Sequence, residues 1–408
     1  MKRVLVKDLK EGYVFSAPVF IEGKNLFVPA GIPVRKKDIA RLNFLAIESV
    51  QTEGELIDNL LEDGTAESIE SINSKITVES EPTKDETPVP EKGKPSIVSL
   101  SEVHENKGAY RLYMDFVERL DAVCQNIAIG TLVEARTIDG ITGSLLQAVR
   151  DQRQSYIEFI LGGEIENYEM AKSLVNTSIL SALMAMELKL PGQKVSSTVT
   201  GALLHDVGML RMPNEIVQKK GGLSPEELKR IQSHPVHTYN IVTKEIALPE
   251  SVGVIVLQHH ERWDGEGYPK RIAGQGIDIG ARIVSVADAF EAMVSKKPYR
   301  KSMLGYQAMK NLLSDNMRRF DPYVIKAFTQ TMGIYPIGSI VLLNNGAIAR
   351  VVKVMPVAAL RPRIKLLVDE SGKVFKQDEG AEIDLLAEKS LFISKAMDPT
   401  EVSAKYAQ

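Results

Sequence analysis

The sequence has little of what several common kinds of site require. Cys124 is the only cysteine among 408 residues, which excludes an internal disulfide and a zinc site built from several thiolates. A single cysteine also fits a reducing compartment, so we expect the protein to be cytoplasmic. We find no secretion signal and no run of the ~18 apolar residues that a membrane helix needs, and we expect no membrane span.

An excess of positive charge is also lacking. The chain has 50 Lys and Arg residues against 53 Asp and Glu residues, which gives a formal charge of -3 and a sequence pI of about 6.2. This balance provides no general field for nucleic acid or an anionic membrane. We therefore expect no DNA partner, and we expect any anionic ligand to be bound locally.

Changes in pattern along the chain predict several segments, and its length suits two or three domains. Between Glu79 and Pro95, four prolines and eight charged residues accompany a single aliphatic side chain. Such a stretch cannot offset the entropy of ordering and is typical of a flexible linker. The predicted segments are an N-terminal β-rich domain over 1–55, an acidic, proline-rich linker over 56–105, a helical connector over 106–160, a helical domain over 161–333, a small β unit over 334–392 and a tail over 393–408.

The central part has the period of helices. Apolar residues recur every three or four positions from Leu112 to Ile127, a stripe that either packs in the core or forms a dimer or signalling helix. Ser224, Pro225 and Glu227 form a capping-box pattern at a helix start. Further helices are expected at roughly 168–190, 195–205, 225–234, 249–261 and 280–295.

The C-terminal part returns to strands. Asn344-Asn345-Gly346 separates two β-rich runs and predicts a hairpin, and the run over 370–372 indicates a second one. The predicted fold is therefore multidomain. An all-α helical bundle is flanked by a small N-terminal β-rich (α+β) domain and a small C-terminal β appendage.

Histidine is scarce, and its distribution points to a site. Five of the six histidines lie within 56 positions. Four of them stand near predicted helix ends together with carboxylates, in the set His205, Asp206, His234, His259, His260 and Asp288. A carboxylate among apolar neighbours needs a cation. Because adjacent residues project about 100° apart on a helix, we expect an adjacent pair to address two neighbouring ions rather than to clamp one.

The chemistry of this set favours a metal centre. Nitrogen and oxygen donors without a thiolate suit Fe or Mn, and also Zn. Two ions about 3.5–4 Å apart can activate water and stabilise an in-line displacement at phosphorus. The residues therefore indicate hydrolysis of a phosphodiester.

The same residues carry a family resemblance. His205-Asp206-Val207-Gly208 resembles the signature of the HD phosphohydrolase superfamily, and the run over 259–269 resembles the motif of its HD-GYP members. The segments over 280–283, 286–288 and 297–300 match further parts of that pattern. The resemblance implies an all-α domain that binds two or three divalent ions, Fe or Mn, and hydrolyses the bacterial second messenger cyclic di-GMP to pGpG or GMP.

The resemblance also assigns roles by position. It implies that the six residues of the set above are metal ligands, with Glu169 as an additional ligand, and that Lys297 and Arg300 bind the substrate phosphates. The motif loop contains Asp264, Gly265, Gly267, Tyr268 and Pro269. We expect the glycines to permit tight turns, and Tyr268 to shape the loop or to contact substrate or a partner.

Two positions depart from the family pattern. Ser173 stands where the family has a metal-binding histidine, and Met209 stands where it has a lysine. These departures leave a second hypothesis open, in which a catalytically impaired centre serves as a cyclic di-GMP sensor or a partner-docking module. Signalling proteins that bind through the Gly-Tyr-Pro loop or the N-terminal domain are candidate partners, and a homodimer is a candidate assembly. A phosphohydrolase for mononucleotides is disfavoured by the extended motif.

Overall fold

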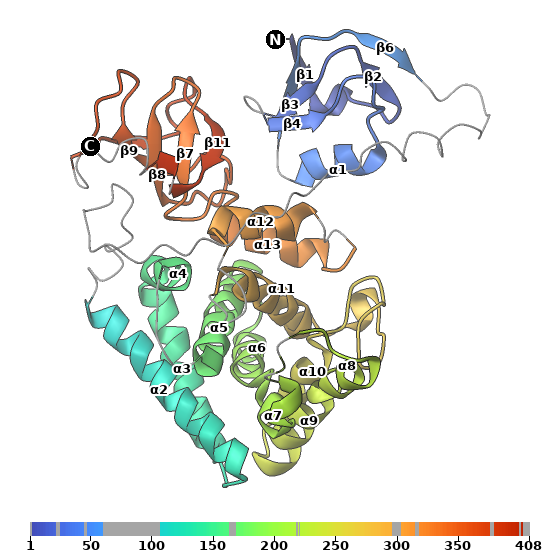
Figure 1. Ribbon diagram of the computed structural model, residues 1–408, viewed down its shortest axis with the longest axis vertical. Coiled ribbons are helices and arrows are strands. Elements are labelled where there is room, and N and C mark those ends of the chain that lie inside the picture. Colours follow the sequence, from blue (N-terminus) through green and yellow to red (C-terminus); the bar gives the residue numbers. More distant parts are fainter. Residues whose placement is uncertain are drawn as a thin grey trace. The chain divides into compact units, whose positions relative to one another are not determined.

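The structure is a computed structural model (Figure 1). It describes residues 2–21, 25–44, 47–59, 107–162, 169–217, 219, 221–295, 303–314, 318–375, 379–399 and 401–402. The chain divides into two compact units. One unit comprises Met1–Ser99, Phe392–Lys395 and Pro399–Gln408, and the other comprises Leu100–Leu391 and Ala396–Asp398. Most of the predicted linker lies outside the described residues.

The first unit is the predicted β-rich domain. Its strands are β1 (Lys2–Leu5), β2 (Tyr13–Phe15), β3 (Val19–Ile21), β4 (Asn25–Val28), β5 (Ser49–Thr52) and β6 (Leu56–Asn59), with one helix, α1 (Lys36–Phe44). A four-stranded sheet has the order β1-β5-β3-β4, and β2 pairs with β6. Val19, Val34 and Val50 are fully buried in its core. Strand β6 lies within the segment predicted as linker. It pairs with β2 there and so continues the fold of the N-terminal domain.

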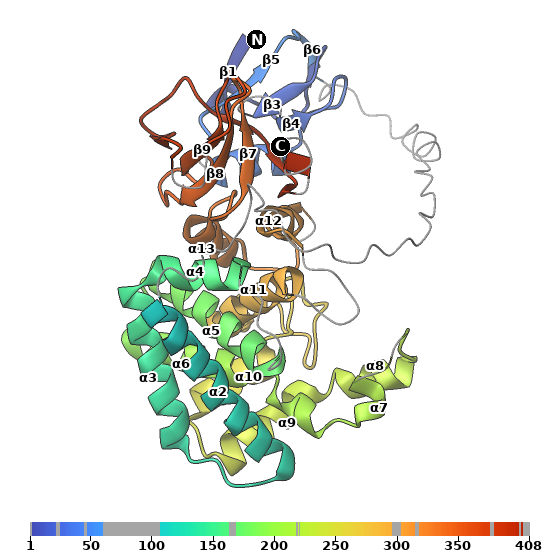
Figure 2. The ribbon, with the colours of Figure 1, turned by 60° about the vertical axis from the view of Figure 1, so that its left-hand side comes forward.

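The second unit begins with the helical domain (Figure 2). Its helices are α2 (Lys107–Ile129), α3 (Ala135–Asp151), α4 (Arg153–Gly162), α5 (Glu169–Glu187), α6 (Gly192–Leu204), α7 (Asn214–Val217), α8 (Pro225–Ile231), α9 (His234–Asn240), α10 (Glu250–Gln258), α11 (Ile279–Val294), α12 (Gly305–Ser314) and α13 (Pro322–Met332). Helix α5 packs against α2, α6, α11 and α13. Every residue of α5 from Leu174 to Ala185 is buried, as expected for a helix whose residues are mostly apolar or small on all sides.

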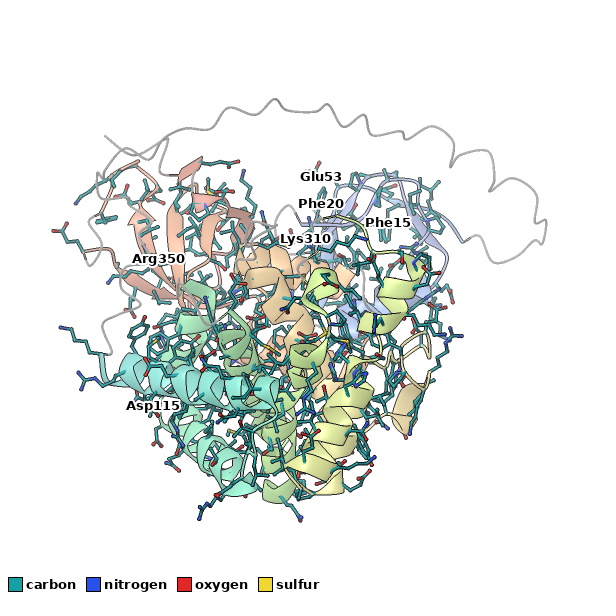
Figure 3. The ribbon with its side chains drawn as sticks, turned by 60° about the horizontal axis from the view of Figure 1, so that its bottom comes forward. Phe15, Phe20, Glu53, Asp115, Lys310 and Arg350 are labelled. Carbon is teal, nitrogen blue, oxygen red and sulfur yellow. The ribbon has the colours of Figure 1, made fainter. Side chains whose placement is uncertain are left out.

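Helix α2 shows the predicted amphipathic pattern. Phe116, Leu120 and Ile127 of the stripe are buried, whereas Leu112 is 38% exposed. Asp115, labelled in Figure 3, lies on the solvent side and pairs with Arg119 at 3.4 Å. The buried face therefore favours ordinary packing as the role of this stripe.

The start of α8 is confirmed, but its end differs from the prediction. Ser224 Oγ accepts a hydrogen bond from the backbone N–H of Glu227, and the Glu227 side chain accepts from the Ser224 backbone N–H, which completes the capping box. Helix α8 then ends at Ile231, and His234 begins α9 instead of ending α8. Pro235 explains the break, because proline fits the first turn of a new helix and not the interior of an old one.

A five-stranded sheet follows the helices. Its strands are β7 (Ile340–Leu343), β8 (Ile348–Lys353), β9 (Arg363–Val368), β10 (Glu382–Asp384) and β11 (Ile393–Met397), in the order β10-β9-β8-β7-β11. The Asn-Gly hairpin is confirmed, since β7 pairs with β8 and Gly346 has a φ of 89°. Strand β11 lies in the segment predicted as a tail. The predicted fold class, an α-helical bundle between two small β-containing parts, is confirmed. In the described part of the chain, no helix combines the length and apolarity that crossing a bilayer requires.

Candidate metal centre

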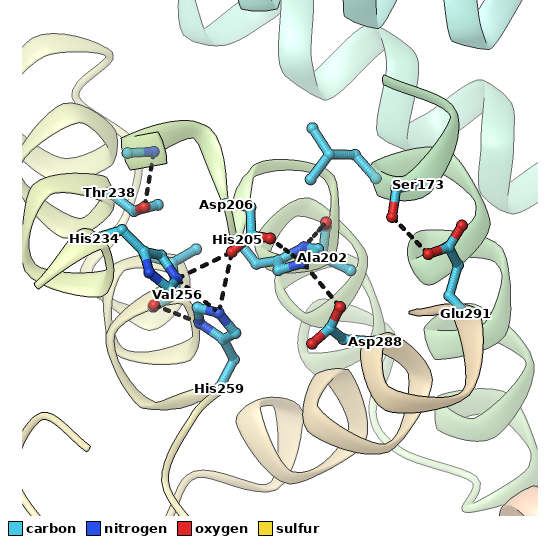
Figure 4. Close-up of polar contacts among 12 residues, drawn as sticks. Ser173, Ala202, His205, Asp206, His234, Thr238, Val256, His259, Asp288 and Glu291 are labelled. Carbon is cyan, nitrogen blue, oxygen red and sulfur yellow. Dashed lines mark hydrogen bonds and ion pairs between the residues drawn. The ribbon is translucent and has the colours of Figure 1, made fainter. Parts of the chain in front are cut away.

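Three histidines reach the centre from helix ends with their ring orientation fixed (Figure 4). His205 directly follows α6, His234 begins α9, and His259 directly follows α10. Each Nδ1 lies 2.8 Å from the backbone carbonyl oxygen three residues earlier, which belongs to Ala202, Ile231 and Val256 respectively. Because a carbonyl only accepts, Nδ1 carries the proton of each neutral ring. The Nε2 lone pairs are therefore directed to a ligand.

These Nε2 atoms converge on Asp206. Asp206 Oδ1 lies 3.0 Å from His234 Nε2 and 3.5 Å from His259 Nε2. Its Oδ2 lies 3.5 Å from His205 Nε2, which is also 3.7 Å from Asp288 Oδ1. The two oxygens of Asp206 thus address different histidines, which is the arrangement expected of a carboxylate shared between two ions.

The side chains form two groups with the spacing of metal ligands. One group holds Asp206, His234, His259 and His260, and the other holds His205, Asp206 and Asp288. Within each group one ligand atom per residue lies within 4.8 Å of the others. The buried His205 Nε2 makes no hydrogen bond to any described residue and lies beside two carboxylates, those of Asp206 and Asp288. The donor set therefore fits divalent cations.

The adjacent pairs differ from the expectation that neighbouring residues address different ions. His259 and His260 belong to the same group, with ring centroids 4.1 Å apart. The 100° separation applies only inside a helix, whereas α10 ends at Gln258 and both histidines lie at or beyond that end. A helix terminus brings the two imidazoles together in a way that the helix interior does not.

Burial and neighbouring charges shift the pKa values of the ionisable groups at the centre. Burial would lower the pKa of His205, but Asp206 and Asp288 together raise it to about 9. Burial would raise the pKa of Asp206, but the charge of His205 and the adjacent imidazoles of His234 and His259 hold it well below its usual range. Burial lowers the pKa of His260, and the neighbouring His259 lowers it further. In the metal-free chain, His205 therefore holds a proton between two carboxylates.

The Gly-Tyr-Pro loop is shaped by close backbone contacts. A Cβ atom at Gly267 would lie 2.4 Å from the Arg262 nitrogen and 2.5 Å from the His260 carbonyl oxygen, so only glycine fits there. Gly265 has a φ of 81°, which glycine adopts without strain. Asp264 pairs with Arg262 at 2.7 Å and accepts a hydrogen bond from the Glu266 backbone at 3.1 Å. This network holds the turn that follows the two histidines.

Glu261 is a residue of this loop for which the sequence pattern predicts no role. It is 3% exposed and accepts hydrogen bonds from the backbone nitrogens of Lys270 at 2.7 Å and Ile272 at 3.0 Å. The loop it holds places the Tyr268 ring against His260, with centroids 4.7 Å apart and 30° between the rings. Its place in the sequence, directly after the two histidines, is the signal that could have indicated this positioning role.

Ser173 and Met209 are the two positions at which the sequence departs from the expected family pattern. Ser173 on α5 donates a 2.6 Å hydrogen bond to Glu291 Oε2 and is in neither ligand group. Glu169 begins α5 with an exposed side chain and is also in neither group. Met209 is half-buried in the 3-10 turn Val207–Arg211. Lys297 and Arg300, predicted to bind phosphate, lie outside the described residues.

The fold and this cluster define a helical domain with a histidine and carboxylate centre, and comparisons give its family. A family model described as HD domain matches residues 162–324, and one described as KOW domain associated with HD domain matches residues 340–405. The match assigns residues 162–324 to the HD domain family, and the resemblance found in the sequence is confirmed for that part of the chain.

Curated relatives match this chain over part of its length. It is 31% identical to the cyclic di-GMP phosphodiesterase PdeB of Borreliella burgdorferi over 58% of this chain and 62% of the relative. It is 30% identical to the cyclic di-GMP phosphodiesterase PA4108 of Pseudomonas aeruginosa over 60% of this chain and 58% of the relative. The chain thus spans about three fifths of these relatives. A solved HDG"Y"P protein from Bdellovibrio bacteriovorus aligns with 80% of this chain and 97% of its own, at 18% identity and a TM-score of 0.45.

Proposed function

We propose that this chain is a metal-dependent phosphodiesterase that hydrolyses cyclic di-GMP to pGpG or GMP in bacterial signalling. The observation that carries the proposal is the pair of ligand groups that share Asp206. Two ions that share a carboxylate suit an in-line displacement at phosphorus. The names of the relatives from Borreliella burgdorferi and Pseudomonas aeruginosa support cyclic di-GMP as the substrate.

The residues of the chain divide the work at this centre. His234, His259 and His260 would hold one ion with Asp206, and His205 and Asp288 would hold the second with the same Asp206 carboxylate. Divalent ions bound there would supply an activated water and neutralise charge on the phosphate oxygens. Backbone carbonyls fix the tautomers of three histidines, so little reorganisation is needed when ions bind.

The nature of the donors supports Fe or Mn as the ions. The set contains imidazole nitrogens and carboxylate oxygens and no thiolate, a combination that suits these metals. We propose two ions rather than three, because Glu169 and Ser173 lie outside both groups. Lys297 and Arg300 remain the proposed phosphate ligands on the basis of the family resemblance.

The sensor hypothesis has weaker support. It rests on Ser173 and Met209, yet neither residue is needed for the two ligand groups. The relatives named as phosphodiesterases favour an enzyme. A cytoplasmic location, signalling partners at the Gly-Tyr-Pro loop and a homodimer remain proposals from the sequence.

The test is an assay of the purified chain loaded anaerobically with Fe or Mn. Chromatography should detect pGpG or GMP from cyclic di-GMP, and EDTA should abolish the product. A His237→Gln variant is a suitable control, because His237 is exposed and belongs to neither ligand group. Tight binding of cyclic di-GMP without any product would favour the sensor and reject the enzyme.

A further inference from the structure

The turn that carries Asp206 lies directly on helix α9. Asp206 stands between α6 and the 3-10 turn Val207–Arg211, and Gly208 of that turn is buried. A Cβ atom at Gly208 would lie 2.5 Å from the His234 carbonyl oxygen and 2.6 Å from Thr238 Oγ1, so no side chain fits between the turn and α9. The main chain after Asp206 therefore contacts the helix that begins with His234.

A hydrogen bond from Gly208 to Thr238 holds this contact (Figure 4). The Gly208 backbone N–H donates to Thr238 Oγ1 at 3.0 Å, and Thr238 is fully buried. The first N–H groups of a helical turn have no partner within that turn, and here the Thr238 hydroxyl provides a partner from another helix. Because Thr238 lies one helical turn after His234 on α9, it connects the elements that carry His234 and Asp206.

The position of the Asp206 carboxylate depends on this main chain. Asp206 Oδ1 is buried and makes no hydrogen bond to any described residue. It lies 3.0 Å from His234 Nε2, and Asp206 belongs to both ligand groups. Since no donor among the described residues holds this oxygen, its distance from His234 is set by the main chain over 206–208 and by the attachment of that segment to α9.

We propose that Thr238 is a positioning residue of the metal centre, which holds Asp206 where both ligand groups can share it. The inference rests on the metal centre of the proposed function, and it adds a residue that belongs to neither ligand group and acts through Asp206. Residues that orient metal ligands through hydrogen bonds contribute about 10–100-fold to metal affinity or activity. Without the Thr238 acceptor, the buried Gly208 N–H is left unsatisfied unless the turn moves, and that movement displaces Asp206.

The test measures Mn²⁺ binding to the metal-free chain, with Thr238→Val as the main variant. Valine has nearly the shape of threonine but lacks the acceptor oxygen. We expect the affinity for Mn²⁺, titrated with detection of free Mn²⁺ by electron paramagnetic resonance, to fall by at least about 10-fold. Thr238→Ser keeps the hydroxyl, and its Mn²⁺ affinity should stay within about 3-fold of the wild type.

Thr329→Val is the matched control. Thr329 is 4% exposed and lies on α13, and its hydroxyl donates to the Ile325 carbonyl at 2.9 Å, so this variant also loses a buried hydrogen bond. Thr329 belongs to neither ligand group, and the Mn²⁺ affinity of Thr329→Val should stay within about 3-fold of the wild type. Thermal midpoints of the metal-free chains measure the stability that each variant loses. The comparison separates positioning of Asp206 from a general loss of stability.

Three results would overturn the inference. They are wild-type Mn²⁺ affinity in Thr238→Val, an equal loss of affinity in Thr238→Val and Thr329→Val, and an equal loss in Thr238→Val and Thr238→Ser. If Thr238→Val does not fold, Thr238→Ser and Thr238→Ala make the same comparison, because they differ only in the hydroxyl. Equal Mn²⁺ affinities in that pair would overturn the inference as well.

The Mn²⁺ titration needs no substrate, so its result is independent of the assay with cyclic di-GMP. If the wild type binds Mn²⁺ but releases no pGpG or GMP, the proposed function fails, and the affinities of the variants still decide the role of Thr238. If the wild type releases product but Thr238→Val binds Mn²⁺ like the wild type, only this inference fails. A wild type that binds no Mn²⁺ would contradict both.

Discussion

The Ser173 hydroxyl donates a 2.6 Å hydrogen bond to the carboxylate of Glu291, one helical turn beyond Asp288 on α11. Glu291 is 1% exposed, and it also accepts hydrogen bonds from Asn176 at 3.4 Å and from Ser295. Tyr113 extends this network with a 2.8 Å hydrogen bond to Asn176. Ser173 therefore satisfies a buried carboxylate one helical turn from Asp288 of the metal centre.

Removal of this hydroxyl should lower stability. Ser173→Ala leaves Glu291 with one donor fewer, and we expect the free energy of unfolding to fall by about 1–3 kcal/mol. Ser178→Ala is the matched control on the same helix, because its buried hydroxyl donates to the Leu174 carbonyl rather than to a carboxylate. That variant should lower the free energy of unfolding, measured with urea, by less than about 1 kcal/mol. Equal losses for the two variants would mean that the Ser173–Glu291 hydrogen bond contributes no more to stability than the hydrogen bond from Ser178 to Leu174.

Asp206→Asn should disable both ligand groups at once. An amide oxygen is neutral and binds a divalent ion more weakly than a carboxylate, and Asp206 belongs to both groups. We expect turnover of cyclic di-GMP to fall by at least about 100-fold and metal content to fall with it. Elemental analysis and product chromatography measure the two effects. Full metal content in Asp206→Asn would show that Asp206 is not a shared ligand.

Gly267→Ala should distort the loop that holds Tyr268. Its Cβ would meet the Arg262 nitrogen at 2.4 Å, and we expect a stability loss of about 1–3 kcal/mol. Turnover should fall by at least about 10-fold, because the loop positions groups at the centre. Gly143→Ala is the control, since its Cβ meets no atom within 4 Å. Within α3 that change should stabilise the chain by about 0.5–1 kcal/mol. A Gly267→Ala variant with the stability and turnover of the wild type would contradict the close contact.

The metal-free chain should lose stability as the solution becomes alkaline. Asp206 and Asp288 overcome burial and raise the pKa of His205 from 6.5 to about 9, so the folded chain binds a proton that the unfolded chain has released. The contribution is fully present below about pH 6.5 and is lost as pH rises through about 9. Urea unfolding of EDTA-treated protein across this range checks it. His205→Gln should flatten the dependence, whereas His237→Gln, at an exposed position, should not. The same slope in wild type and His205→Gln would exclude His205 as its source.

The sequence was sufficient to predict the helical domain and the six side chains that the structure brings together. Apolar periodicity marks the helices, and the scarcity of histidine makes its clustering visible. The sequence could not predict that His259 and His260 share one group, because that depends on where α10 ends and how the chain turns there. The roles of Glu261 and Glu291 were also missed, since their hydrogen-bond partners come from other segments of the chain.

The most direct test of the account is a count of bound ions. Elemental analysis of the wild-type chain, loaded anaerobically with Fe or Mn and freed of excess metal, should give two ions per chain. This number follows from two ligand groups that share Asp206 and exclude Glu169 and Ser173. One ion or none would contradict a two-ion centre, and three ions would show that residues outside the two groups also bind metal.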